Sequence, residues 1–341
     1  MAHTFTASGE AKALIEPVQP TEERALRTLT SHNMVAAFVR ETQDIESLDA
    51  QIDANFNERD RNARAMNATY TGADETVRLR GGEPVVWDSR ARTKAVEIDT
   101  DTRNDISYSR GKTATTYYSQ EQTNGATPFS KVKSPVYITA DRAEFRHVEG
   151  IAIYTGGARA WQDENFVRAD KLTIYRETKR MEGDGHVQSA LYQARRKAKD
   201  GSGEVVPVFA TADRMAYSDT DRLLHYEGNV DIKQSTDRIT SAVSDVYLLK
   251  ENNEVERTVA QRDVILTQPG RRGSGDWAQY TAADETVILK GNPARVEDTE
   301  QGTTEGGRLT VYLRDSRVIA DDSRGPQSPG RVRSTHKIRK Q

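Results

Sequence analysis

At four places in this 341-residue chain an aromatic residue is followed eleven positions later by glycine, with a short apolar, strand-like run between them. The pairs are Tyr70 and Gly81, Phe145 and Gly156, Tyr217 and Gly228, and Tyr280 and Gly291. The flanks repeat as well, because the heptapeptide TGADETV at 71–77 returns as TAADETV at 281–287. One such unit cannot bury its apolar face alone. The spacing therefore predicts stacked repeats, with a function that belongs to the whole stacked surface.

Short apolar segments rich in β-branched and aromatic residues separate the turn signals. They lie at 151–154, 172–175, 230–232, 246–249, 287–289 and 309–313, bounded by Gly, Asn and Asp. Segments of this kind are typical of β-strands. We expect each aromatic-to-glycine interval to be one strand and the turn that follows it. The pattern predicts an all-β, antiparallel fold built from repeated strand pairs.

The order of these segments predicts two copies of one domain. Residues 3–118 follow the same order of elements as residues 154–320, without the strands that should come first. We expect a truncated β domain at 1–120, a polar Gly- and Pro-bearing linker at 121–134, a complete β domain at 135–322 and a basic, disordered tail at 323–341. The upstream part of the first copy is expected to be missing from this chain.

Charge and composition limit the partners. With 49 basic and 52 acidic residues the net charge is −3, which gives no electrostatic reason to predict nucleic-acid binding. Residues 323–341 contain no acid and six basic residues, so this tail is either a solvated end or a contact for an anionic surface. There are no cysteines, hence no disulfides. No stretch reaches the roughly 18 apolar residues of a membrane helix, and residues 1–14 do not resemble a signal peptide.

Motifs for chemistry are weak. The six histidines are far apart, and His225 in the strand-like segment 223–226 is interpreted as structural. The acidic segment 99–105 lacks the glycine and the late glutamate of a calcium loop. Catalytic sites rarely repeat with a scaffold, so we predict no enzyme, no cofactor and no metal.

Alternation along the predicted strands assigns one set of side chains to the inside. Thr173 is expected to face outward. From periodicity alone this lining is either a closed sandwich core or a groove for an apolar ligand. The candidate lining residues are Val136, Ile138, Phe145, Tyr154, Ala158, Leu172, Ile174, Leu191, Met215, Tyr217, Tyr226, Val230, Ile232, Val246, Leu248, Leu289, Leu309 and Val311.

Several motifs in this order resemble a known family. Segment 135–145 contains Ala-Asp at 140–141, the motif that starts a unit in the family. Segment 167–175 carries an Ala-Asp-x-Leu-x-x-Tyr strand, and residues 226–230 read Tyr-Glu-Gly-Asn-Val. These motifs are similar to those of the OstA/LptA family of lipopolysaccharide-transport proteins. The resemblance covers about 135–320 well and 3–118 weakly. Departures occur at 81–84, where Gly-Gly-Glu-Pro replaces Gly-Asn-Val, and at Ala158, where the family usually has valine.

The resemblance implies two sheets meeting in a V, an open jelly roll whose apolar groove holds lipid A acyl chains. It also implies a periplasmic location, with the export signal or membrane anchor outside this chain. The implied partners are lipopolysaccharide, other β-slide transport proteins that pair edge strand to edge strand, and further copies of the chain joined end to end. Two alternatives stay open: a structural or adhesive β-repeat protein with a closed core, and a carbohydrate-active enzyme, which would need paired carboxylates in a cleft.

Overall fold

The computed structural model describes residues 3–16, 26–42, 44–123, 125–129, 133–191, 195–197, 203–250, 254–313, 317–321 and 333–335. Contacts divide the chain into two compact units. The first contains Met1–Gly125, Val132–Ala160 and Lys171–Thr178, and the second contains Ala126–Lys131, Trp161–Asp170 and Lys179–Gln341. The four-part domain division expected from the sequence stays a prediction. Most of the basic tail at 323–341 lies outside the described residues.

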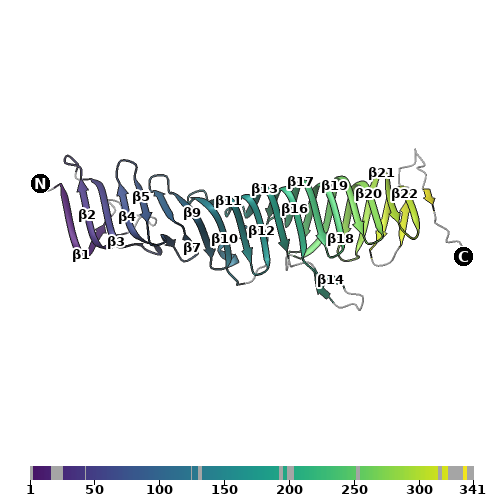
Figure 1. Cartoon of the computed structure of the whole chain (residues 1–341), viewed down its shortest axis with the longest axis horizontal. Helices are drawn as coiled ribbons and strands as arrows, with labels where there is room; N and C mark the ends of the chain where they lie inside the picture. Colours follow the sequence, from purple (N-terminus) through teal and green to yellow (C-terminus); the bar gives the residue numbers. More distant parts are fainter. Residues whose placement is uncertain are drawn as a thin grey trace. The chain divides into compact units, whose positions relative to one another are not determined.

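Unit 1 is a series of antiparallel strands with one short 3-10 helix (Figure 1). Consecutive strands pair from β1 to β4, β9 pairs with β7 and β8 on one side, and its other side pairs with β10. The elements are β1 (Thr4–Ile15), β2 (Arg27–Phe38), β3 (Ile45–Glu58), β4 (Arg61–Thr71), β5 (Thr76–Arg80), β6 (Val85–Trp87), β7 (Ala91–Lys94), β8 (Glu97–Asp101), β9 (Ile106–Tyr117), η1 (Gln120–Thr123) and β10 (Val136–Arg146).

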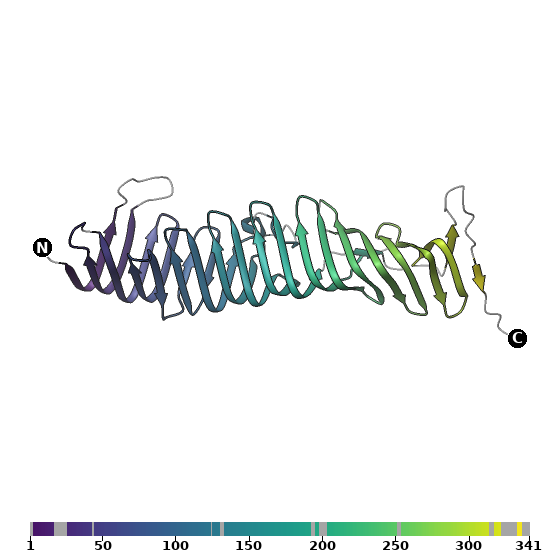
Figure 2. The same cartoon turned by 90° about the horizontal axis from the view of Figure 1, so that it is seen from above.

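Unit 2 continues the same construction (Figure 2). Strand β13 pairs with β16, and the strands from β16 to β22 then pair in chain order. The division between the units passes through β11 (Ile151–Gln162) and β12 (Asn165–Tyr175). The other elements are β13 (Arg180–Leu191), β14 (Arg195–Lys197), β15 (Gly203–Val205), β16 (Val208–Ser218), β17 (Leu223–Gln234), β18 (Asp237–Leu248), β19 (Val255–Gln268), β20 (Arg271–Thr281), β21 (Thr286–Asp298), β22 (Gly302–Tyr312), β23 (Val318–Asp321) and β24 (Arg333–Thr335).

Many of the long strands are bent in the middle by two consecutive residues in the left-handed region. In β17 these are Gly228, with φ of 78°, and Asn229, with φ of 48°, and the pairing register shifts there. This geometry is that of a β-bulge, which bends a strand and re-aims its two halves. The same pair of left-handed residues occurs at Gly9 and Glu10, Ile52 and Asp53, Gly111 and Lys112, Gly156 and Gly157, Gly185 and His186, and Arg262 and Asp263.

The Ala-Asp motif supports these bends. A Cβ on Gly228 would lie 2.3 Å from Asp213 Oδ2, so the aspartate of the preceding strand packs directly over the glycine. Asp170 packs in the same way over Gly185. Each carboxylate also hydrogen-bonds the second bend residue where that residue is polar, as in Asn229 Nδ2 to Asp213 Oδ2 at 2.9 Å. Only glycine accommodates both the left-handed backbone and the close aspartate.

Three of the four repeated glycines do not lie in the turns that the sequence interpretation gave them. Gly156, Gly228 and Gly291 lie inside β11, β17 and β21, whereas Gly81 follows β5 outside any strand. The turns of the first two fall between the aromatic residue and the glycine, at 147–150 and 219–222. At these three glycines the interpretation as strand plus turn was wrong, because a bulge and a turn both favour a positive φ and glycine marks either one.

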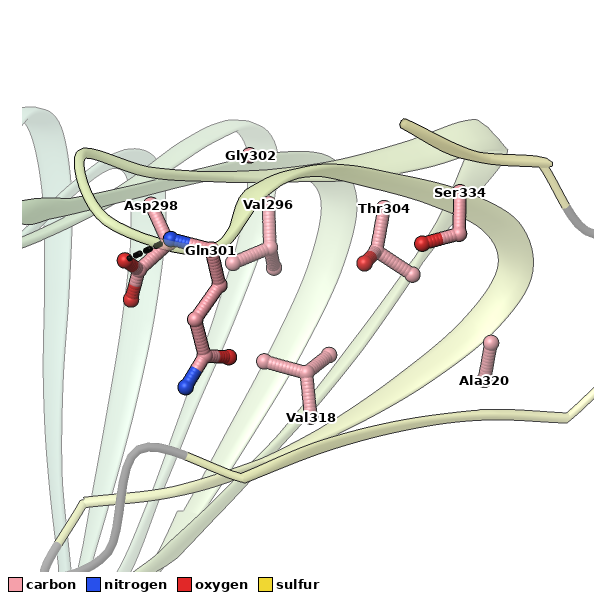
Figure 3. Close-up of a pocket in the computed structure, with 8 residues that line it drawn as sticks. All are labelled: Val296, Asp298, Gln301, Gly302, Thr304, Val318, Ala320 and Ser334. Atoms are coloured by element: carbon pink, nitrogen blue, oxygen red, sulfur yellow. Dashed lines mark hydrogen bonds between the residues drawn. The ribbon is translucent and has the colours of Figure 1, made fainter. Parts of the chain in front are cut away.

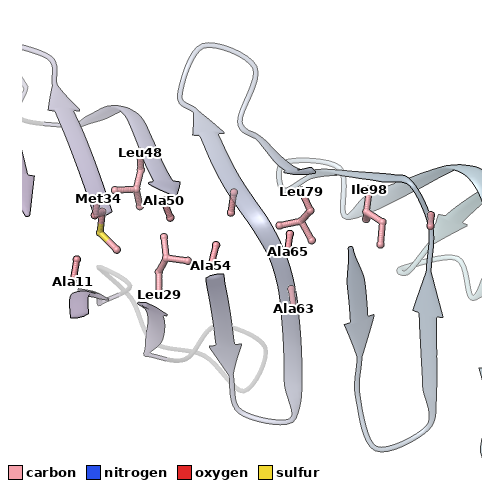
Figure 4. Close-up of a cluster of buried hydrophobic side chains, with 12 residues drawn as sticks. Ala11, Leu29, Met34, Leu48, Ala50, Ala54, Ala63, Ala65, Leu79 and Ile98 are labelled. Atoms are coloured by element: carbon pink, nitrogen blue, oxygen red, sulfur yellow. The ribbon is translucent and has the colours of Figure 1, made fainter. Parts of the chain in front are cut away.

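Small side chains line the inside of the bends. In unit 1 the buried cluster contains Ala50 and Ala54 on either side of the β3 bend, and Ala63 and Ala65 on the neighbouring β4 (Figure 4). Larger residues such as Leu79 and Ile98 fill the space farther from the bend. Alanine fits where the two halves of a strand approach each other, because a longer side chain would hold them apart.

The all-β, antiparallel class predicted from the sequence is confirmed. Every strand pairing given above is antiparallel, and the described residues contain no α-helix. Among those residues no helix has the length and apolar character to span a membrane.

Candidate functional site

The predicted lining residues are almost all inside. Phe145 is half-buried and the other seventeen are buried, none more than 7% exposed. Seven lie in unit 1, namely Val136, Ile138 and Phe145 on β10, Tyr154 and Ala158 on β11, and Leu172 and Ile174 on β12. The rest lie in unit 2, namely Leu191 on β13, Met215 and Tyr217 on β16, Tyr226, Val230 and Ile232 on β17, Val246 and Leu248 on β18, Leu289 on β21, and Leu309 and Val311 on β22. Their assignment to a ligand groove stays a prediction, since burial is shared by a groove wall and a closed core.

In unit 1 the lining includes a pair of aromatic rings. Phe145 and Tyr154 meet edge to face with their ring centroids 5.8 Å apart. Burial raises the pKa of Tyr154 well above its ordinary value, and the nearby phenol of Tyr117 adds to this effect. Burial also raises the pKa of Tyr117, so the phenols of Tyr117 and Tyr154 are both neutral at physiological pH.

In unit 2 the few inward polar groups pair with each other. Ser189 Oγ lies 2.8 Å from Tyr226 Oη, and both groups are buried. Burial raises the pKa of Tyr226 to about 12. On the neighbouring strands Tyr226 lies opposite Met215 and opposite Ser244, which is also buried. Ser244 Oγ lies 2.9 Å from Ser241 Oγ, so these buried serines are hydrogen-bonded as well.

A small cavity of about 40 Å³ shows which parts of the bent strands face one another in unit 2. Ile232 and Leu266 line it from the segments of β17 and β19 that follow a bend, while Thr258 lines it from the segment of β19 before the bend. Val287 lines it from the part of β21 that precedes the register shift between Lys290 and Ala294. The two halves of the bent strands thus enclose a common interior. The remaining lining residues are Val208, Gln234, Asp237, Ile239, Val255, Tyr280 and Leu313.

A larger cavity of about 230 Å³ lies at the last strands of unit 2 (Figure 3). Val296, Val318 and Ala320 supply its apolar wall, and Asp298, Gln301, Gly302, Thr304 and Ser334 its polar rim. The backbone N–H of Gln301 donates to Asp298 Oδ1 at 2.9 Å. The cavity therefore has an apolar side and a hydrogen-bonded polar side.

An ion pair anchors the polar side of this cavity. Arg271 Nε lies 3.2 Å from Asp298 Oδ2, and the two side chains are only 8% and 14% exposed. Burial on its own raises the pKa of Asp298, but the N–H groups of Gln301 and Glu300 together with Arg271 lower it below the ordinary 3.8. The carboxylate is charged at neutral pH.

Arg271→Met is expected to lower the free energy of unfolding at pH 7 by roughly 1–3 kcal/mol, because it leaves Asp298 charged without its cation. Since the folded-state pKa of Asp298 is depressed, its stabilisation is present above about pH 4 and is lost as the pH falls through the folded-state value. Urea unfolding at pH 7 and pH 3 measures both effects. Arg295→Met, at an ion pair that is half exposed, should change stability by less than about 1 kcal/mol. Equal losses in the two variants would contradict the prediction.

Thr173, which was expected to face outward between Leu172 and Ile174, is buried, with an exposed fraction of 3%. Because neighbouring side chains of a strand point to opposite faces, three consecutive buried residues mean that both faces of β12 are covered here. The outward direction of Thr173 stays a prediction. His225 Nδ1 lies 2.7 Å from Asp245 Oδ1 on the next strand, and its interpretation as a structural residue stays a prediction.

Sequence reasoning missed inward residues that follow a simple rule. Positions two and four residues before and after the first bend residue face inward, as Leu224, Tyr226, Val230 and Ile232 do around Gly228. The same rule finds Val187 on β13 and Leu266 on β19, which alternation of short strands did not select. Within unit 1 it extends the lining to β3, where Leu48, Ala50 and Ala54 surround the bend. The described residues contain no cluster of acidic or histidine side chains suited to a metal ion.

Comparison with known proteins identifies the family. The model of the family described as LptA/(LptD N-terminal domain) LPS transport protein matches residues 137–211 and 210–317, more than half of the chain. The chain belongs to this family. The LptA/LptD N-terminal family is one of transport proteins, and its matches fall on β10 to β22, the strands that carry the predicted lining.

Among solved structures, one match is LptH from Pseudomonas aeruginosa, described as the LptA-homologous periplasmic component of the conserved lipopolysaccharide transport device. The two chains are 20% identical, the match covers 39% of this chain and 96% of LptH, and the TM-score is 0.35. No curated protein matches the chain.

Proposed function

We propose that the chain binds the lipid A acyl chains of lipopolysaccharide in the interior enclosed by its bent strands, and passes them on as part of a bridge across the periplasm to the outer membrane. The observation that carries the proposal is the family match over the strands with the apolar lining. The shared interior of unit 2, lined from both halves of the strands, supports it. Such transport needs no catalytic group in this chain.

The bridge would form through edge strands. Among the described strands, β1 pairs only with β2, and its residues from Thr4 to Glu10 are exposed. An unpaired edge presents backbone N–H and C=O groups to another strand. We propose that such edges join the chain to other transport proteins of this type, or to further copies of itself, by strand addition.

Crosslinking tests the proposed groove with two adjacent positions on β17. Ile232 lines the small interior cavity, whereas Lys233 is exposed on the opposite face. A photoreactive amino acid at position 232 is expected to crosslink to purified lipopolysaccharide, and the same amino acid at 233 is not. The readout is a lipopolysaccharide-positive band on a denaturing gel, after thermal melts show that both variants are folded.

A closed-core β-repeat protein without a lipid ligand is the second candidate. The observation in its favour is the near-complete burial of the predicted lining around a cavity of only about 40 Å³. The same experiment separates the two candidates. Crosslinking from 233 but not 232, or from neither position, contradicts transport through the interior and favours the closed core.

A further inference from the structure

The inner face of β9 differs from that of the other bent strands. Counting from its bend at Gly111, the inward positions hold Ser107, Ser109, Thr113 and Thr115. All four are buried, with exposed fractions of 8%, 1%, 1% and 1%. We call these residues the hydroxyl stripe.

Equivalent positions on other strands are mainly apolar. Around Gly228 of β17 they are Leu224, Tyr226, Val230 and Ile232, and around Ile52 of β3 they are Leu48, Ala50, Ala54 and Phe56. Strands β13 and β19 each hold one hydroxyl of this kind, Ser189 and Thr258. A strand whose four positions are all Ser or Thr is therefore a departure from the repeat, and packing does not require it.

The two outer members of the stripe have protein partners. Ser107 Oγ lies 2.9 Å from His147 Nε2 and 3.0 Å from Thr100 Oγ1. Thr115 Oγ1 lies 3.1 Å from Thr93 Oγ1. These contacts satisfy the ends of the stripe.

The two central members have none. Ser109 Oγ and Thr113 Oγ1 are buried, and no hydrogen-bond partner for either is found in the described part of the chain. Their neighbours across the strands cannot supply one, because Ser109 lies opposite Ile98 and Ala143, and Thr113 lies opposite Ala140. Buried hydroxyls are normally paired, so two adjacent exceptions at the inside of one bend call for an external partner.

The surroundings define the chemistry of that partner. Side chains near the two hydroxyls are small and apolar, with Ala140 and Ala143 on β10 and Ile98 on β8 all buried. The buried charged residues among those described are Glu58, Arg271 and Glu285, none of which lies on β7 to β10. Among the described residues, this site therefore has no buried counter-charge for a charged ligand group. A hydroxyl both donates and accepts, so its best complement is another uncharged hydroxyl.

We propose that Ser109 and Thr113 form a subsite for the hydroxyl group of a hydroxylated acyl chain, at the inside of the β9 bend in unit 1. The inference rests on the proposed binding of acyl chains in the interior and adds a polar selectivity to it. The apolar walls hold the hydrocarbon, while the two hydroxyls favour chains that carry a hydroxyl over chains that do not.

The test compares two probes, methyl 3-hydroxytetradecanoate and methyl tetradecanoate, as competitors of a fluorescent acyl ester bound to the full chain. The wild-type protein is expected to bind the hydroxylated ester about two- to tenfold more tightly, the range for one net hydrogen bond. The double variant Ser109→Ala/Thr113→Val should bind both esters equally. Thr116→Val, on the opposite face of the same strand, should keep the preference.

The melting temperature gives a second readout. If the two hydroxyls served the fold, removing them would lower the melting temperature, whereas the proposed subsite predicts the opposite. Without lipid, the double variant should melt at the same temperature as the wild type or higher, because it removes unpaired buried polar groups. A lower melting temperature, or a preference that persists in the double variant, overturns the subsite. Equal binding of both esters by the wild type overturns the subsite alone, whereas binding of neither ester overturns it together with the proposed function.

Discussion

Gly156→Ala is expected to lower the free energy of unfolding by about 2–4 kcal/mol, one of the two largest effects predicted for this chain. Part of the loss is the cost of a left-handed backbone for a residue with a Cβ, roughly 1–2 kcal/mol. The φ of Gly156 is 85°. The remainder is steric, since the new Cβ would lie 2.5 Å from Asp141 Oδ2 and 2.7 Å from Asp141 Cβ. The Cβ atom cannot rotate away, so the strands must separate. Urea unfolding measures the effect.

The adjacent residue provides the control. Gly157 is also left-handed, with φ of 63°, but no atom lies within 4 Å of the position its Cβ would take. Gly157→Ala should therefore cost only the backbone part, about 1 kcal/mol. If the two variants lose the same stability, the aspartate contact contributes nothing and the bends depend on backbone conformation alone.

These glycines also mark how far the fold could be predicted from the sequence. The all-β class and the repeats followed from spacing and residue type. The bend itself did not, because a glycine with positive φ signals a turn or a bulge equally well. The Ala-Asp motif on the preceding strand distinguishes the two, but its meaning emerges only when Asp213 is seen to pack over Gly228.

The candidate site was predictable where strands alternate cleanly. On β17 the buried residues Tyr226, Val230 and Ile232 were found from sequence. They stay on one face although the pairing register with β18 shifts at the bend, between Glu227 and Val230. Alternation did not predict the burial of Thr173, which lies between two other buried residues. Alternation of apolar residues also did not select Ser109 and Thr113, because their side chains carry hydroxyl groups. Their burial depends on the bend at Gly111, which strand periodicity does not encode.

Leu289→Ala is expected to lower the free energy of unfolding by about 3–4 kcal/mol, in the upper part of the range for truncating a buried leucine. Leu289 is fully buried in the cluster formed by β19 to β22. Its side chain fills space left by two glycines of β20, since a Cβ on Gly275 or Gly273 would lie 3.0 Å or 3.3 Å from a Leu289 methyl group. Glycines have no side chain that could refill the cavity. Ile288→Ala, on the half-buried opposite face, should cost about 1 kcal/mol or less.

The glycines allow the cavity explanation to be tested by partial repair. Gly273 is not left-handed, so alanine meets no backbone penalty there, and in the wild type its methyl group would press against Leu289 and Leu266. Gly273→Ala should thus be neutral or slightly destabilising alone. In the Leu289→Ala background the same methyl group enters the vacated space and should recover about 0.5–1 kcal/mol. Urea unfolding of the two single variants and the double variant gives the coupling energy. Additive losses would mean that the space collapses after truncation, and that Leu289 stabilises the sheet through contacts other than those over the β20 glycines.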